Sequence, residues 1–125
     1  MHHYLALDIG LRRTGVAYAS SDAGVPLALK TIKHDTFDVL NEKVADLFKE
    51  KDITHLIVGL PLLPSGDEGE QVEIVRSAVD KMPIPSHILT IFIDERHTTP
   101  REKYKDPDAA AACEILSMYL HKENI

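Results

Sequence analysis

The alternation of hydrophobic and polar positions divides the chain into eight elements. Three short apolar runs come first, at residues 4–9, 14–20 and 26–32, and each has the length and composition of a strand. Residues 21–24 (SDAG) between the second and third runs are typical of a hairpin turn. Because the links between the three runs are short, the pattern predicts that these strands are antiparallel neighbours.

In the second part of the chain, apolar residues recur at the spacing of an amphipathic helix, which predicts three helices. This spacing runs from residue 37 to 48, from 72 to 82, and from 107 to His121. The residues that should bound these helices are Asp35 or Thr36 before the first, Pro83 after the second, and Asp106 as N-cap with Pro107 at the first position of the third.

Two further strands are predicted between the helices, at residues 53–58 and 88–93, with a Gly/Pro-rich loop at 59–69. The order is therefore βββαβαβα. Helical crossovers require parallel pairing of the first, fourth and fifth strands. We expect an α/β fold with one mixed five-stranded sheet and helices on both faces, formed by a single domain over residues 1–125.

Acidic residues gather at one edge of this predicted sheet. Asp8 closes the first strand, Asp94 and Glu95 close the fifth, and Asp108 lies in the first turn of the last helix, on the face that Ala112 shares. Hard oxygen ligands select Mg²⁺ or Mn²⁺, and a pair of such ions can promote phosphodiester cleavage. Each acid alone is also typical of a turn or helix start, so the pattern leaves both interpretations open.

Composition narrows the classes of protein that fit. The chain has 14 Lys and Arg against 20 Asp and Glu, a formal net charge of −6, which excludes nucleic-acid binding through a bulk positive field. The single cysteine, Cys113, excludes an internal disulfide and a multi-Cys zinc site. No apolar run approaches the roughly 20 residues of a membrane span, and the N-terminus lacks a signal-peptide pattern. We therefore expect a cytoplasmic protein.

Five segments in sequence resemble the YqgF (RuvX) family of the RNase H-like superfamily, beside the RuvC-type Holliday junction resolvases. They are residues 5–17 (LALDIGLRRTGVA), 57–62 (IVGLPL), 66–76 (GDEGEQVEIVR), 93–99 (IDERHTT) and 108–120 (DAAAACEILSMYL). The resemblance implies an RNase H-like fold and a metal-dependent nuclease, a hydrolase of ester bonds that processes the precursor of 16S rRNA in ribosome biogenesis. A resolvase of branched DNA is the alternative.

The resemblance also implies roles for individual residues. Asp8, Glu95 and Asp108 look like the catalytic carboxylates and the ligands of two Mg²⁺ or Mn²⁺ ions. The turn under the substrate backbone would comprise Gly10, Arg12, Arg13 and Gly15. Arg13 and Arg96 suit phosphate contacts because a guanidinium fork binds phosphate at two points, and Thr98 would cap a helix or bind phosphate.

One departure from the family pattern bears on activity. Between Arg96 and Asp108 the family usually has a longer basic helical segment, whereas here only residues 97–107 intervene. This leaves a second hypothesis open, an RNA-binding ribosome-assembly factor with weak nuclease activity. It also leaves the oligomeric state open, because a junction resolvase needs a homodimer while an RNA processor can act as a monomer.

Overall fold

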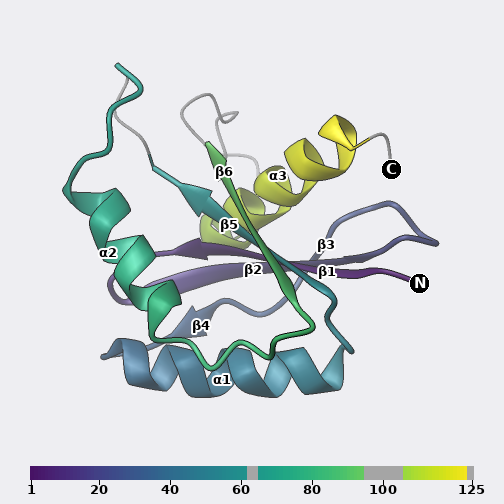
Figure 1. The fold of residues 1–125 in the computed structure, drawn as a ribbon, viewed down its shortest axis with the longest axis horizontal. Coiled ribbons are helices and arrows are strands. Elements are labelled where there is room, and N and C mark those ends of the chain that lie inside the picture. Colours follow the sequence, from purple (N-terminus) through teal and green to yellow (C-terminus); the bar gives the residue numbers. More distant parts are fainter. Residues whose placement is uncertain (62–64, 95–105, 124–125) are drawn as a thin grey trace.

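The computed structural model describes residues 1–61, 65–94 and 106–123, and its centre is one mixed sheet (Figure 1). The strand order is β3-β2-β1-β5-β6, and β4 also pairs with β2. The strands are β1 (His3–Ile9), β2 (Arg13–Ser20), β3 (Leu27–Ala28), β4 (Ile32–Lys33), β5 (His55–Leu60) and β6 (Leu89–Asp94). The helices are α1 (Phe37–Glu50), α2 (Glu70–Asp80) and α3 (Pro107–Lys122).

The pairing of the strands confirms the predicted topology. β1 is antiparallel to β2 and parallel to β5, and β5 is parallel to β6. The carboxyl ends of β1, β5 and β6 therefore meet at one edge of the sheet, which is where an α/β fold binds its ligands.

The predicted third strand, residues 26–32, is wrong in one respect, because it divides into β3 and β4. From Ala28 to Ile32 this edge strand advances four positions, whereas β2 advances only three between Ala17 and Thr14. The extra residue is a β-bulge, which interrupts the ladder although the Leu29 N–H still donates to the Val16 carbonyl at 2.9 Å. The sheet thus has six strands instead of the five expected.

The predicted fourth strand, residues 53–58, begins two residues later, as β5. The Ile53 N–H donates to the Phe48 carbonyl at the end of α1, so Ile53 belongs to the turn although its side chain is fully buried. At the other end, pairing with β6 continues to Leu60 opposite Asp94, so Gly59 and Leu60 belong to the strand and not to the loop.

Two apolar cores lie on opposite faces of the sheet, as predicted. On one face, Leu5 and Leu7 of β1 pack with residues of α1 and α2, such as Val44 and Val75. On the other face, Tyr4 and Ala6 pack with α3. Figure 1 shows α1 below the sheet and α3 above it. None of the helices within the described ranges is long and apolar enough to cross a membrane.

Candidate active site

Asp8 lies at the carboxyl end of β1, and its place in the alternation puts it on the α3 face. Ala6 and Tyr4, two and four positions earlier, pack with α3, whereas Leu7 and Ile9 belong to the core under α1 and α2. Asp8 is half-buried and lines a cleft of about 370 Å³ between the end of β1 and the start of α2.

Gly15 brings the first turn of α3 to this position. It is the antiparallel partner of Asp8 in the register of β1 and β2. A Cβ atom at residue 15 would lie far inside 3.0 Å of the Asp108 carbonyl oxygen, an approach that real Cβ atoms essentially never show, and 3.2 Å from the Ala109 nitrogen. Only glycine therefore allows α3 to begin directly over β2, and this places Asp108 beside the strand position opposite Asp8.

Asp106 fixes where α3 begins. One of its carboxylate oxygens accepts hydrogen bonds from the backbone N–H groups of Asp108 at 3.1 Å and Ala109 at 3.2 Å, which confirms the predicted N-cap. Its other oxygen accepts a hydrogen bond from the Thr31 hydroxyl at 2.5 Å. That hydrogen bond, and then the two from the backbone, hold the pKa of Asp106 below its usual value.

The turn from β1 to β2 presents two arginines beside these acids. The Gly10 N–H donates to the Arg13 carbonyl at 3.0 Å, and a Cβ at Gly10 would approach that oxygen to 2.5 Å, so the turn requires glycine. Arg13 Nε lies 3.3 Å from Asp108 Oδ2, and the Arg12 guanidinium lies 3.9 Å from the carboxylate of Asp35. Arg12 and Asp35 are both exposed, so this ion pair is weak, whereas Asp108 is about one-third exposed (31%).

Comparison with known proteins identifies the family. Residues 2–122 match the sequence pattern of the family described as "RuvX: Holliday junction resolvase". The chain belongs to the RuvX family. A protein of Sulfurihydrogenibium sp. (strain YO3AOP1) named "Putative pre-16S rRNA nuclease" is 34% identical over 135 residues, with 98% of this chain and 92% of that protein covered. A relative of the same name in Roseiflexus sp. (strain RS-1) is 31% identical, with 95% and 94% covered.

Solved structures confirm the RNase H-like fold of this RuvX protein. RuvC of T. thermophilus in complex with a Holliday junction substrate superposes with a TM-score of 0.67 at 10% identity, covering 99% of this chain and 96% of that one. The fowlpox virus Holliday junction resolvase gives a TM-score of 0.59 at 13% identity, with 96% and 99% covered. At such identities the likeness concerns the fold alone.

Of the three carboxylates expected from the resemblance to the RuvX family, Asp8 and Asp108 are within the described residues and Glu95 is not. Asp8 and Asp108 lie on the same face of the sheet, and Asp94 ends β6 on the opposite side, following Ile93, which packs under α3. Glu95, Arg96 and Thr98 lie outside the described residues, so their predicted roles stay predictions.

The donor chemistry of this RuvX site suits a hard divalent cation, although the described part is incomplete. Asp8 and Asp108 supply carboxylate oxygens, the ligand type that Mg²⁺ and Mn²⁺ prefer. Within residues 1–61, 65–94 and 106–123, no group of three or more His, Cys, Asp or Glu side chains is arranged to hold a metal ion. A third metal ligand would have to come from residues outside these ranges, and Glu95 is the residue predicted for that role.

Two polar contacts near the site, one part-buried and one buried, were not predicted from the sequence. One is the hydrogen bond from Thr31 to Asp106, and the other joins Thr14 Oγ1 to His34 Nε2 at 2.9 Å. The first connects the bulged edge strand to the N-cap of α3, and the second connects β2 to the residue that follows β4. A threonine or histidine in a short apolar run carries no local signal of such a partner, so the sequence pattern alone could not have identified either contact.

Proposed function

We propose that this RuvX-family protein is a metal-dependent nuclease that hydrolyses phosphodiester bonds in the precursor of 16S rRNA. The observation that carries the proposal is the close approach of α3 to Gly15, the register partner of Asp8, which brings two carboxylates to the same face of the sheet. The names of the two relatives support the RNA substrate. A role in ribosome biogenesis implies a cytoplasmic location.

Asp8 and Asp108, together with Glu95, would hold Mg²⁺ or Mn²⁺, and we propose a pair of ions. When bound, such ions supply Lewis-acid activation of the phosphodiester. Two half-buried carboxylates on one face repel each other, and a bound cation would relieve that repulsion. The contact of Arg13 with Asp108 already does so in part, since its guanidinium lies 3.3 Å from Oδ2.

Arg13 has a second part in the proposal, as a phosphate contact. Its side chain is about two-thirds exposed (64%), so its remaining N–H donors reach solvent beside Asp108. A guanidinium in that position can bind a phosphate oxygen of the substrate while it holds the carboxylate in place. We propose the same role for Arg96 and Thr98, with Gly10, Arg12 and Gly15 forming the turn under the substrate backbone.

The test is cleavage of a 16S rRNA precursor fragment and of a four-way DNA junction, with Mg²⁺ or Mn²⁺ and with chelator. Asp8→Asn and Asp108→Asn should each abolish cleavage of the RNA while the proteins stay folded. Asp80→Asn, which removes an equal charge at the exposed end of α2, is the control and should cleave like wild type.

The other outcomes separate the alternatives. Metal-dependent cutting of the junction alone would replace the RNA substrate by branched DNA, as the family description and the fold of RuvC favour, and would require a dimer. RNA binding in chelator without cleavage under any condition would refute the nuclease and favour an assembly factor. Full activity of Asp8→Asn would refute the site.

A further inference from the structure

A hollow of about 620 Å³ lies between the bulged edge strand and α1, away from the carboxylates. It is lined by four lysines, two from the edge strand and two from α1 or its C-cap, and by the acids Asp46 and Glu50. The lysines are Lys30, Lys33, Lys43 and Lys51. Positive side chains therefore outnumber negative ones here in a protein whose net charge is −6.

A second hollow, of about 460 Å³, connects this region to the candidate active site. Its lining includes Arg12, Arg13 and Asp35, and it shares Lys33 with the first hollow. Arg13 in turn contacts Asp108. Basic side chains thus continue from the first turn of α3, past the β1–β2 turn, to α1. We name the two hollows together the basic groove.

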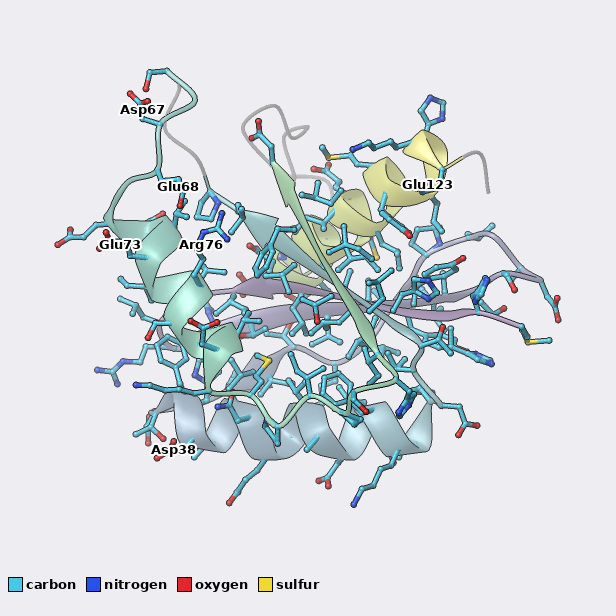
Figure 2. The ribbon with its side chains drawn as sticks, viewed as in Figure 1. Asp38, Asp67, Glu68, Glu73, Arg76 and Glu123 are labelled. Carbon is cyan, nitrogen blue, oxygen red and sulfur yellow. The ribbon has the colours of Figure 1, made fainter. Side chains whose placement is uncertain are left out.

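Acidic side chains predominate on the neighbouring surfaces. The other flank of α1 lines a separate hollow with Asp38, Glu42 and Asp46, against the single cation Lys81, and Asp46 lies on the border between this hollow and the basic groove. At the start of α2, Arg76 Nε lies 3.0 Å from Glu68 Oε1. Figure 2 shows two further acids in this region, Glu73 on α2 and Asp67 in the loop that precedes the helix. The separation of charge means that the basic groove attracts a polyanion although the protein as a whole repels one.

Several contacts hold the groove in shape before any ligand arrives. Lys43 Nζ donates to the Lys33 carbonyl at 3.4 Å, and Lys51 Nζ lies 5.4 Å from the centre of the Tyr18 ring. Thr31 lines the groove and donates to Asp106, the cap of α3. Side chains that are already ordered lose less conformational freedom on binding. The groove is also tied directly to the helix that carries Asp108.

We propose that the basic groove binds the phosphodiester backbone of the substrate strand and leads it to the carboxylates. This inference rests on the proposed function, and it adds a binding surface between the edge strand and α1 to the site residues. The chemistry recognised is the row of phosphates along a single strand, because lysines read charge and not base sequence.

The test measures the affinity of a single-stranded RNA oligonucleotide in chelator, as a function of salt, so that cleavage does not enter. The variant Lys30→Gln/Lys33→Gln removes two charges from the groove. The matched control, Lys81→Gln/Lys122→Gln, removes two charges from exposed positions outside it. Thermal melts should show that both variants fold like wild type.

We expect the groove variant to lower the slope of log affinity against log salt by roughly 0.7 per lysine, which is on the order of eightfold in affinity per lysine at about 50 mM salt. The control should bind like wild type. Equal losses in the two variants would overturn the inference, because net charge alone would then explain them. So would wild-type affinity in the groove variant.

Failure of this inference can be distinguished from failure of the proposed function. If Asp8→Asn cleaves like wild type, the nuclease site is wrong, but the difference between the two lysine variants in chelator still stands. If the groove variant binds like wild type, the groove is wrong, but loss of cleavage in Asp8→Asn still stands. A single-stranded DNA of the same sequence should bind through the groove with the same salt slope, and a smaller slope for DNA would refute recognition of the phosphates alone.

Discussion

Replacing Gly15 with alanine tests the geometry of the site through a single methyl group. The new Cβ would lie well under 3.0 Å from the Asp108 carbonyl oxygen, and the obstacle is backbone, which cannot rotate away as a side chain can. The first turn of α3 must retreat by about 1 Å. Overpacking of this kind costs about 1–3 kcal/mol of unfolding free energy. At about 4 °C per kcal/mol for a domain of this size, the melting temperature should fall by roughly 4–12 °C.

The same displacement should impair catalysis more than it impairs folding. Asp108 moves with the helix, and a misplacement of about 1 Å in a reacting constellation can cost about 100-fold in rate. Cleavage of the 16S rRNA precursor fragment, measured well below the melting temperature and per folded molecule, should therefore drop about 100-fold in Gly15→Ala.

Gly24→Ala is the control that separates stability from activity. A Cβ at residue 24 meets no atom within 4 Å, but the φ angle of 67° is left-handed and costs an alanine about 1–2 kcal/mol. This variant should lose comparable stability and keep wild-type cleavage. If Gly15→Ala melts and cleaves like wild type, the contact between β2 and α3 is refuted. If it melts early but cleaves normally, the position of Asp108 is not critical to catalysis.

Two further predictions concern polar contacts around the site. Asp106→Ala removes both the Thr31 contact and the cap of α3, so it should cost about 1 kcal/mol more unfolding free energy than Thr31→Val, which removes the Thr31 contact alone. Equal losses of the two variants in urea melts would contradict the cap. Burial lowers the pKa of His34, outweighing its Thr36 and Asp35 neighbours, so folding favours the neutral ring. The contribution of His34 to stability should be fully present above about pH 6.5 and should be lost as the pH falls below that value. The unfolding free energy should therefore decline less steeply with falling pH in His34→Gln than in wild type, and parallel pH profiles would refute this.

Features that depend on neighbouring residues were predictable from the sequence. The caps Thr36 and Asp106 were expected, and both bond to backbone N–H groups within three residues. The parallel order of β1, β5 and β6 was also expected, because a helical crossover permits little else. Helical spacing likewise predicted that Asp108 shares a face with Ala112, which is fully buried against the sheet.

Features that depend on distant partners were not predictable in the same way. The bulge after Ala28 arises from a mismatch in count between two strands, and a continuous apolar run gives no sign of it. The contact of Thr31 with Asp106 spans 75 positions. The resemblance to the RuvX family assigned Gly15 to the turn under the substrate, and that role stays a prediction. The structure shows a different reason for a glycine here, since a Cβ would clash with the backbone of α3, and the residues around position 15 could not have predicted that contact.

These distant contacts together determine where Asp108 lies. The first turn of α3 is held from below by its contact with Gly15 of β2 and from the side by the bond between Thr31 and Asp106. Thr31 belongs to the segment between β3 and β4, where the extra residue of the bulge changes the direction in which side chains point. Without that residue, the alternation of the strand would continue unbroken, and the side chains on one side of the bulge would turn to the opposite face of the sheet. The bulged segment thus helps to position α3, and the edge strand that binds substrate in our proposal also contacts the helix that carries Asp108.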